Sequence, residues 1–446
     1  MKYEMRDKLS RQNLKKEIYS MGKKKLVTLL GGVCLVLVLA ALPFVAACAS
    51  PVEEECVTDA DCPEGYICVD GVCVLEEEEV KVLKVAQLQP LSGFGAGYGT
   101  MDKIAYTLAV EDINAAGGIK VGDEYYQLEI VEYDTVCDPV IAATLATKAI
   151  YDDGVKYIGM LGCGTEGQAI LPIVEQENVV LFVLTDDSSY IGTEHPNAFY
   201  IFQYSPACAE IQYEYISTEY PDLTRVVGTF PDTSAGQALA DVWEEVVTDF
   251  GFEIVDTIFI PSDTTEFYPV LTPLLGQDVD IIEQAGFPGE TSGKMIVQAR
   301  ELGYEGIFTE FTGGEVETRT ISAGGLEALE GFICTGYPIL PVTAFGETFS
   351  ERCEAVQAGT AIWVGYFYDS MWLLKLAIEK AGSIEPAEVM LALEEVTFSG
   401  VMGEDVRFAG EEVVGLNRLF ASLYVVTRIE NGEPVTVYSA MPLWAR

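Results

Sequence analysis

The sequence predicts an α/β protein made of two doubly wound lobes joined by a hinge, and three observations support this prediction. Residues 82–118 read as a strand, a glycine-rich loop and a helix that stops at a pair of glycines. Residues 125–185 alternate between apolar strands and helices, which is typical of a parallel sheet covered by helices. The same alternation restarts at 225–230 and runs on to 306–309, which predicts a second lobe.

Each expected element follows from its residue pattern. In the opening strand, apolar and polar residues alternate from Val82 to Leu88, and a loop of small residues follows from Pro90 to Gly99. Residues 363–382 form an expected helix with one apolar stripe, which favours a core face over a cofactor site. That stripe consists of Phe367, Met371, Leu374 and Ile378. The other expected elements are strands at 125–134, 157–163, 179–185, 253–260 and 279–285, helices at 139–153, 165–177, 235–250, 267–276 and 290–302, and a terminal hairpin of 419–429 and 435–439.

The composition limits the function. The chain has 446 residues, enough for two lobes with substantial cores. Its formal net charge is −44, which excludes nucleic-acid binding because that function needs a basic face. An anionic ligand would need a local arginine or lysine against this field. The single histidine, His195, lies in a turn-like segment, so we expect neither imidazole catalysis nor a histidine-rich metal site.

Residues 1–47 are expected to form a leader. Residues 1–20 are polar and basic, and we interpret them as an extension ahead of a true start at Met21. From Met21 a basic start and an apolar stretch lead to VAAC, which resembles a bacterial lipoprotein processing site ending at Cys48. We therefore expect cleavage and lipidation at Cys48, which would supply enough acyl chains for stable anchoring. The alternative is an uncleaved membrane helix, because 26–47 are long enough to span a bilayer.

Residues 48–81 are expected to form a solvated stalk around a small disulfide knot. Four cysteines lie close together in a segment with too few apolar residues for a core, namely Cys56, Cys62, Cys68 and Cys73. In an exported chain this density indicates two disulfides, and the sequence does not choose among the three pairings. The alternative is a zinc knuckle, although the spacings are poor for zinc ligation. Runs of glutamate at 53–55 and 76–79 bracket the knot.

Three segments carry a family resemblance. They are PLSGFGAGYG from Pro90, AVEDINAAGGI at 109–119 and DTVCDP at 134–139. In this order and spacing they resemble the beginning of the branched-chain amino-acid-binding proteins of ABC transporters, which have the type I periplasmic binding protein fold. The resemblance continues weakly to about residue 410.

The resemblance implies how the chain is divided between the lobes. In that family the chain crosses between the lobes three times. We therefore expect lobe 1 to comprise 82–205 and 332–403, and lobe 2 to comprise 206–331 and 404–446.

The resemblance also implies a pairing for two of the remaining cysteines. Cys137 and Cys163 match two positions that form a disulfide in many family members, and both follow expected strand ends. Cys334 and Cys353 are expected to form a second bridge. Cys208 is then expected to be a buried structural thiol.

Binding an amino acid needs N–H groups and hydroxyls for its carboxylate, a carboxylate for its ammonium, and an apolar wall for its side chain. The resemblance implies two loops for the ligand carboxylate, Cys163-Gly164-Thr165 and Thr185-Asp186-Asp187-Ser188. The first loop has Gly164 where the family has a hydroxyl, and the second carries two acids, which would repel a carboxylate unless they point away. Asp186 could instead meet an ammonium or amide, and equally both aspartates could cap the following turn.

The other ligand contacts are also implied by the resemblance. Tyr98 and Phe287 match aromatic residues of the apolar wall, whereas Ala235 stands where the family often has an aromatic, which predicts a wider pocket there. For the ligand ammonium we expect Glu310, although Thr312 aligns equally well with the family's acid.

The resulting prediction is a lipid-anchored, extracytoplasmic substrate-binding protein at the periplasmic or cell-surface side of the membrane. We expect a monomer that binds an amino acid or similar small polar metabolite and presents it to an ABC permease, with no metal or cofactor. No catalytic triad, phosphate-binding loop or metal motif is visible, so an extracellular enzyme is the least favoured alternative. A ligand-sensing receptor module of the same fold, for amides, urea or other small metabolites, is the main alternative.

Overall fold

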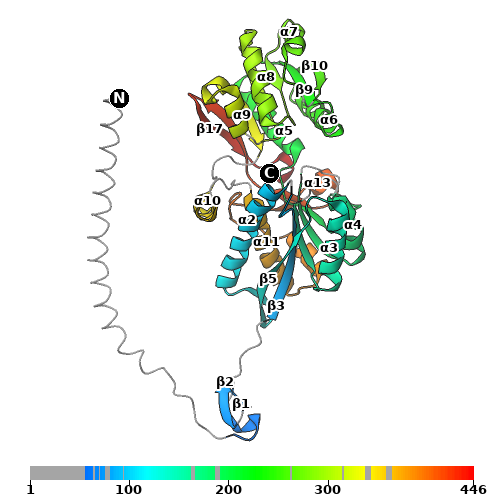
Figure 1. Cartoon of the computed structure of the whole chain (residues 1–446), viewed down its shortest axis with the longest axis vertical. Coiled ribbons are helices and arrows are strands. Elements are labelled where there is room, and N and C mark those ends of the chain that lie inside the picture. Colours follow the sequence, from blue (N-terminus) through cyan, green and yellow to red (C-terminus); the bar gives the residue numbers. More distant parts are fainter. Residues whose placement is uncertain are drawn as a thin grey trace, which may run out of the picture. The chain divides into compact units, whose positions relative to one another are not determined.

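The computed structural model of the chain divides into two units, Met1–Glu79 and Val80–Arg446 (Figure 1). The residues that it describes are 56–63, 66–69, 71–75, 81–93, 95–161, 166–185, 191–261, 264–313, 316–336, 343–357 and 364–446. The expected leader and the lipidation site at Cys48 lie outside these residues. In the described part of the chain, no helix combines the length and apolar character needed to cross a membrane.

The small unit contains the expected two-disulfide knot. A short 3-10 helix, η1 (Asp59–Asp61), precedes the antiparallel hairpin of β1 (Tyr66–Val69) and β2 (Val72–Leu75). Cys56 is bonded to Cys68 and Cys62 to Cys73, so the two bridges are crossed in sequence. The prediction of a disulfide knot is confirmed, and since all four sulfurs are in disulfides, the zinc alternative is not supported.

Lobe 1 is built on an eight-stranded sheet in the second unit. Its strands, in spatial order, are β14 (Arg407–Ala409), β15 (Leu419–Ala421), β8 (Ala198–Tyr200), β7 (Val180–Leu184), β6 (Tyr157–Leu161), β3 (Lys81–Gln89), β5 (Glu124–Asp134) and β4 (Ile119–Val121). The inner strands from β15 to β5 pair in parallel, as the doubly wound prediction requires. Its helices are α2 (Ala96–Ala115), α3 (Pro139–Tyr151), α4 (Glu166–Gln176), α10 (Ala344–Val356), α11 (Gly365–Ala381), α12 (Pro386–Leu393) and α13 (Glu411–Val414). Figure 1 shows α2 and α11 on one face of the sheet and α3 and α4 on the other.

Lobe 2 is built on a seven-stranded sheet. Its strands, in spatial order, are β10 (Glu253–Ile260), β9 (Arg225–Pro231), β11 (Ile281–Glu283), β12 (Ile307–Glu310), β13 (Ile333–Gly336), β16 (Tyr424–Glu430) and β17 (Glu433–Ala440). Its helices are α5 (Ser205–Glu219), α6 (Ser234–Asp249), α7 (Tyr268–Leu275), α8 (Gly289–Glu301) and α9 (Val316–Ala323), with the 3-10 turns η3 (Leu326–Leu329) and η5 (Leu443–Ala445). The strands from β10 to β13 are parallel, and β16 and β17 complete the sheet as an antiparallel hairpin.

The apolar cores form where successive residues of each strand point to opposite faces of the sheet. In lobe 2, Val226 and Val227 enter two different apolar clusters, because neighbouring residues of a strand point to opposite faces of the sheet. Lobe 1 has one apolar cluster that includes the helix stripe expected at 363–382. All four stripe residues, Phe367, Met371, Leu374 and Ile378, have no exposed surface, which confirms that the stripe is core.

The strand order moves two of the three expected crossings between the lobes. The first lies at 201–204, between β8 of lobe 1 and α5 of lobe 2. The second follows β13, which pairs with β12 and β16, so 332–336 belong to lobe 2 rather than to lobe 1. The third lies at 422–423, because β14 and β15 join the lobe 1 sheet. The single strand expected at 419–429 is therefore divided between two sheets.

The last residues contact both lobes. Trp444 packs against the lobe 1 core and against the lobe 2 cluster that contains α5 and α6. Arg407 of β14 donates a hydrogen bond to the main-chain oxygen of Ala445. Arg446 forms an ion pair with Glu214 of α5. The segment after β17 thus adds side-chain links to the covalent crossings.

The expected bridge between Cys334 and Cys353 is wrong. Cys334 lies in the lobe 2 core and Cys353 in the lobe 1 core, and both are buried thiols. Burial raises the pKa of each thiol to about 12, so neither is a reactive thiolate. Cys208 is fully buried and is a thiol rather than half of a disulfide, as expected.

Candidate functional site

In lobe 1, the loop after β3 is held by Asp134, the last residue of β5. The Asp134 carboxylate accepts hydrogen bonds from the N–H groups of Leu91, Ser92 and Val136 at 2.9–3.1 Å and from the Ser92 hydroxyl at 2.5 Å. Partial burial tends to raise the pKa of Asp134, but these hydrogen bonds outweigh it and lower the pKa below its ordinary value. The carboxylate therefore fixes this loop at the carboxyl end of the sheet, where doubly wound folds bind ligands.

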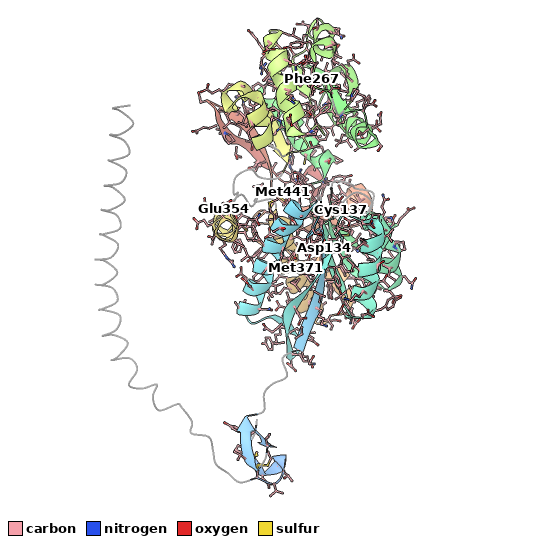
Figure 2. All side chains as sticks on the ribbon, in the orientation of Figure 1. Asp134, Cys137, Phe267, Glu354, Met371 and Met441 are labelled. Carbon is pink, nitrogen blue, oxygen red and sulfur yellow. A yellow bond between two sulfur atoms is a disulfide. The ribbon has the colours of Figure 1, made fainter. Side chains whose placement is uncertain are left out.

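Two of the alternating glycines are explained by close approaches in the same loop. A Cβ atom on Gly95 would lie 2.6 Å from the Cys137 sulfur, and one on Gly99 would overlap the main-chain oxygen of Pro90. Cys137, at a left-handed φ of 58°, is disulfide-bonded. Figure 2 marks Asp134 and Cys137 at the end of β5. Asp134 thus holds the loop that precedes α2, while the pairing of Cys137 with Cys163 stays a prediction.

The other expected lobe 1 contacts are only partly described. Tyr98 lies in the first turn of α2 with 49% of its surface exposed, as a ligand contact requires. Thr185 directly follows β7 and is buried. The remaining expected carboxylate contacts lie outside the described residues, namely Cys163, Gly164, Thr165, Asp186 and Ser188.

In lobe 2, Glu310 ends β12 and forms a buried ion pair with Arg319 of α9. The two side chains are 3% and 0% exposed. Arg319 Nε also donates to Ser292 Oγ at 2.7 Å, and its guanidinium lies 4.7 Å from the centre of the Phe332 ring. The structure thus places a neutralised carboxylate, rather than a lone charge, at the position expected to meet a ligand ammonium.

Thr312 joins this ion pair to the surface. Its hydroxyl donates to Glu310 Oε1 at 2.9 Å and accepts a hydrogen bond of 3.3 Å from the Gly286 N–H. Gln203, in the first crossing, donates from Nε2 to the Thr312 main-chain oxygen at 2.7 Å. Thr312 is partly exposed, so the structure brings Glu310 and Thr312 together but presents Thr312 to the solvent side.

A second buried acid lies beside this group. Glu283, at the end of β11, accepts hydrogen bonds from Thr309 Oγ1 at 2.7 Å and from Gln212 Nε2 at 2.8 Å. Burial raises the pKa of Glu283 to about 7, and the charge of Glu310 contributes to the rise, whereas these hydrogen bonds oppose it. Glu283 has no exposed surface, so we assign it a role in lobe 2 rather than in ligand contact.

Phe287, the expected wall residue of lobe 2, is 4% exposed and belongs to the core cluster on the α8 face. Its backbone follows Gly286, whose N–H group bonds Thr312. The structure therefore places Phe287 beside the candidate site with its ring largely in the core.

Sequence reasoning missed the roles of Asp134 and Arg319. Arg319 is the only lysine or arginine between Arg300 and Arg352, in a stretch rich in glutamate. An isolated cation in such a stretch is a signal for a buried ion pair, because buried charges need partners. From the sequence, Asp134 was recognisable only as an acidic residue at the end of a strand. Only the structure shows that it holds the loop after β3.

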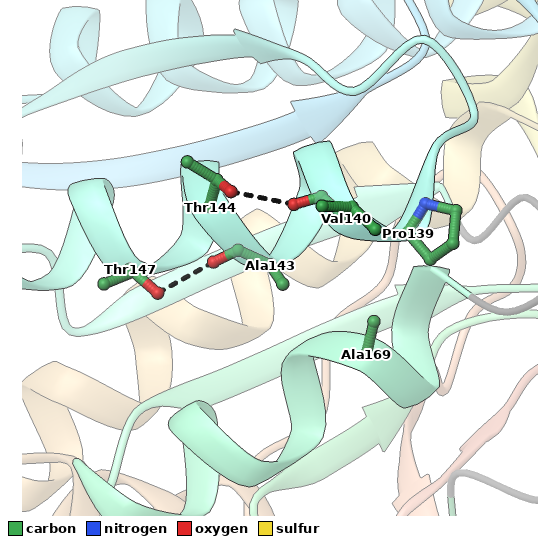
Figure 3. Close-up of a pocket in the computed structure, with 6 residues that line it drawn as sticks. All are labelled: Pro139, Val140, Ala143, Thr144, Thr147 and Ala169. Carbon is green, nitrogen blue, oxygen red and sulfur yellow. Dashed lines mark hydrogen bonds between the residues drawn. The ribbon is translucent and has the colours of Figure 1, made fainter.

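Two shallow hollows in the described residues are lined by none of these candidate site residues. One, of about 410 Å³, runs between α3 and α4 and is lined by Pro139, Val140, Ala143, Thr144, Thr147 and Ala169 (Figure 3). The hydroxyls of Thr144 and Thr147 donate to main-chain oxygens of their own helix at 2.8 Å. This groove therefore offers mainly apolar groups and does not suit a small charged ligand. The other hollow lies at the opposite end of lobe 2, near Leu223 and Tyr304.

Two doubly wound lobes, three crossings and polar groups at the carboxyl ends of both sheets define a two-lobed binding protein. The chain belongs to the periplasmic binding protein family, whose profile matches residues 82–432.

Curated relatives support this assignment at low identity. The leucine-, isoleucine-, valine-, threonine- and alanine-binding protein of Pseudomonas aeruginosa is 26% identical over 323 residues, covering 72% of this chain and 84% of that protein. The Leu/Ile/Val-binding protein of Escherichia coli K12 is 24% identical over 330 residues, covering 72% and 85%. Both are named as binding proteins rather than enzymes, and neither name indicates a sensory receptor, so the ligand-sensing alternative is not favoured.

Solved structures share the fold. A branched-chain amino acid ABC transporter periplasmic ligand-binding protein from Burkholderia xenovorans superposes with a TM-score of 0.70 at 17% identity, covering 81% of this chain and 96% of that one. A Streptococcus pneumoniae branched-chain amino acid transporter substrate-binding protein in complex with isoleucine superposes with a TM-score of 0.61 at 23% identity, covering 81% of this chain and 100% of that one. A solute-binding protein of R. palustris in complex with 4-hydroxybenzoate gives 0.64 at 18% identity, covering 81% and 98%. These likenesses confirm the type I periplasmic binding protein fold.

Proposed function

We propose that this chain is the extracytoplasmic substrate-binding protein of an ABC importer and that it binds an amino acid, or a similar small polar metabolite, between its two lobes. It would work as a non-catalytic monomer and deliver its ligand to a permease. The relatives that are named as binding branched-chain amino acids support an amino acid as the ligand. The similar solved structure in complex with 4-hydroxybenzoate makes small aromatic carboxylates the main competing ligand class.

One observation carries this proposal: polar side chains lie at the carboxyl ends of the strands in both sheets. In lobe 1, Asp134 fixes the loop that leads to Tyr98. In lobe 2, Glu310 and Thr312 end the matching strand. A ligand gripped from both sides would favour closure by hinge motion, which is how such proteins report occupancy.

The rest of the expected contact set belongs to this proposal. The loops at 163–165 and 185–188 would supply hydroxyl and N–H groups to a ligand carboxylate, with Asp186 available for an ammonium or amide. A disulfide between Cys137 and Cys163 would hold the first loop in place. If non-reducing peptide mapping shows Cys137 bonded to a cysteine other than Cys163, the proposed disulfide is overturned.

A thermal-shift screen of the protein without residues 1–48 tests the ligand. The screen uses the twenty L-amino acids, their amides, urea and small aromatic and aliphatic carboxylates, with the D-enantiomer of each hit as control. A ligand at about a hundred times its Kd adds about 2.7 kcal/mol of stability, which is readily measured. A shift with an L-amino acid supports the proposal. If only aromatic carboxylates raise the melting temperature, the ligand is an aromatic carboxylate rather than an amino acid. If no compound raises the melting temperature, the proposed binding function is overturned.

We also propose that Cys48 carries a lipid that holds the protein at the outer face of the membrane. The acidic stretch 76–79 would then separate the disulfide knot from the lobes as a solvated spacer. Metabolic labelling with palmitate should mark the wild type and not Cys48→Ser. A Cys34→Ser variant, which changes another cysteine of the leader, should keep the label; label on Cys48→Ser would contradict lipidation there.

A further inference from the structure

We propose that Asp369 of α11 is a positioning residue of the hinge, which holds residues 400–403 against the second and third crossings and so fixes the axis about which the two lobes close. This inference rests on the proposed binding function, because the hinge serves function only if the lobes close on a ligand. It gives α11, whose apolar stripe belongs to the lobe 1 core, a second role at the boundary of the lobes.

The Asp369 carboxylate holds a segment of main chain inside lobe 1. The residue has no exposed surface. Its Oδ1 accepts a hydrogen bond from the Val401 N–H at 2.9 Å, and its Oδ2 accepts one from the Met402 N–H at 2.8 Å. A Cβ atom on Gly400 would overlap Asp369 Oδ1, so the carboxylate occupies the place that a side chain at 400 would need. Both oxygens are therefore used to hold successive N–H groups of the segment 400–403.

This segment is bonded to the third crossing. The Met402 main-chain oxygen accepts a hydrogen bond of 3.3 Å from the N–H of Leu423, which lies in that crossing. Gly403 permits the close approach, because its φ is 156° and a Cβ atom on it would lie 3.3 Å from the Leu423 nitrogen. Asp369 binds the N–H of the same Met402 whose oxygen holds Leu423, so a single residue joins the carboxylate to the crossing.

The same segment is bonded to the chain that follows the second crossing. Thr343 directly precedes α10, and its hydroxyl donates to the Gly400 main-chain oxygen at 2.8 Å. The same hydroxyl accepts a hydrogen bond of 2.8 Å from the Gly346 N–H and so caps α10. The chain enters lobe 1 at the second crossing and leaves it at the third, and residues of one short segment are therefore bonded to both places.

The first crossing packs on the same end of α11. The ring of Phe202, in that crossing, lies 5.6 Å from the ring of Tyr366 in an edge-to-face arrangement. Tyr366 belongs to the first turn of α11, one turn before Asp369. All three crossings are thus linked to the first two turns of α11, either directly or through 400–403. A helix built into the lobe 1 core therefore provides a fixed base for the hinge.

The chemistry of the carboxylate suits this role. Burial raises the pKa of Asp369 to about 7, and the two N–H groups oppose the rise. At pH 8 the carboxylate is therefore mostly ionised, and hydrogen bonds to an ionised acceptor are roughly twice as strong as neutral ones. Asp369→Asn keeps the size of the side chain but turns one acceptor oxygen into an NH2 group, which cannot accept from the N–H that it would face.

Hydrogen exchange of the ligand-free protein at pH 8 tests the link. Asp280→Asn is the matched control, because the Asp280 carboxylate also accepts two main-chain N–H bonds, but at the amino end of the lobe 2 sheet. We expect exchange at 343–346 and 422–424 to become about tenfold or more faster in Asp369→Asn and to keep the wild-type rate in Asp280→Asn. Unchanged exchange at these residues in Asp369→Asn would overturn the inference, whatever the ligand is.

A second variant separates the link from a general loss of stability. Gly403→Ala leaves the buried carboxylate in place but forces a side chain toward Leu423 at a left-handed φ. We expect it to raise exchange at 422–424 as Asp369→Asn does, while exchange in β6, inside the lobe 1 sheet, stays as in the wild type. An equal rise in β6 in both variants would show that Asp369 only stabilises lobe 1 and would overturn the hinge role.

Binding measurements test the consequence for closure. With the ligand found in the thermal-shift screen, we expect Asp369→Asn to bind about fivefold more weakly than the wild type, because a looser hinge loses more freedom when the lobes close. Asp280→Asn should bind as the wild type does. Faster exchange with unchanged affinity in Asp369→Asn would overturn the role in closure. A wild type whose small-angle scattering shows no compaction with any ligand would overturn lobe closure itself, whereas the exchange rates distinguish that failure from an error in the link.

Discussion

The side-chain amide of Gln203 donates a hydrogen bond of 2.7 Å to the main-chain oxygen of Thr312, and so links the first crossing to the lobe 2 site. Two glycines make room for this amide. A Cβ atom on Gly336 would lie 2.5 Å from Gln203 Oε1, and one on Gly313 would lie 3.3 Å from Nε2. The position of the candidate ligand contact therefore depends on a side chain outside its own sheet.

Replacing Gln203 with methionine should weaken ligand binding. The variant keeps the side-chain length but loses the hydrogen bond, which is worth about 1 kcal/mol or roughly fivefold in Kd. Calorimetry with the ligand found in the thermal-shift screen measures this change. Gln237→Met, at an exposed position of α6, is the matched control and should bind as the wild type does. Equal affinities in Gln203→Met and Gln237→Met would contradict the link.

Trp444 should couple the unfolding of the two lobes, because it packs against both cores. The centre of its ring also lies 6.5 Å from the centre of the Tyr204 ring in the first crossing. We expect Trp444→Ala to lose about 2 kcal/mol of stability, since the residue is only partly buried. Its calorimetric transition should broaden or split as the lobes begin to unfold separately. Leu443→Ala, next to it and 48% exposed, should change stability by less than about 0.5 kcal/mol. A single sharp transition in Trp444→Ala would argue against coupling.

Glu283 should make the protein less stable as the pH rises toward 7. Burial raises its pKa from an ordinary 4.5 to about 7, so the folded chain holds a proton that the unfolded chain releases. Its contribution to stability is therefore fully present below about pH 4 and is lost as the pH rises through about 7. The shift corresponds to about 3 kcal/mol.

Urea unfolding at pH 5 and pH 8 tests the effect of Glu283. Glu283→Gln keeps an acceptor for Gln212 and Thr309 but cannot ionise, so it should lose less stability over this range than the wild type. Glu388→Gln, at an exposed position of α12, should follow the wild type. Parallel pH curves for the wild type and Glu283→Gln would show that Glu283 does not titrate in this range.

The disulfides should hold the small unit without affecting the large one. Cys56–Cys68 and Cys62–Cys73 close loops with sequence separations of 12 and 11, and each loop of this size is worth about 3 kcal/mol. Changing Cys56 and Cys68 together to serine should open 56–75 to proteolysis. The melting temperature of the unit Val80–Arg446 should stay the same, since the two units are separately compact. A lower melting temperature of the large unit would contradict this independence.

The doubly wound pattern was predictable because buried parallel strands and amphipathic helices leave strong periodic signals. Strand 125–134 and helix 139–153 appear in the structure within two residues of their expected limits. The crossings were harder to place, because the sheet to which β13 belongs is set by its pairing with β12 and β16, which only the structure shows. The knot pairing was likewise open, since four cysteines allow three pairings, and only the structure shows that Cys56 pairs with Cys68 and Cys62 with Cys73.

The candidate site was predictable in position but not in chemistry. The strand ends that carry Thr185 and Glu310 could be located from the sequence. The pairing of Glu310 with Arg319 could not, because it depends on how α9 packs on α8 and on the Phe332 ring. The hydrogen bond from Thr312 to Glu310 follows from that pairing, so the choice between these two residues required the structure.

The close packing of Gln203 between Gly313 and Gly336 also limits how this protein can evolve. A lineage that acquires a new ligand can vary exposed candidate contacts such as Tyr98 one residue at a time. A side chain at either glycine position requires a smaller residue at 203, so we expect these three positions to change together among homologues or not at all. Divergence in ligand preference would then accumulate at the pocket surface, while this packing at the first crossing would be inherited unchanged.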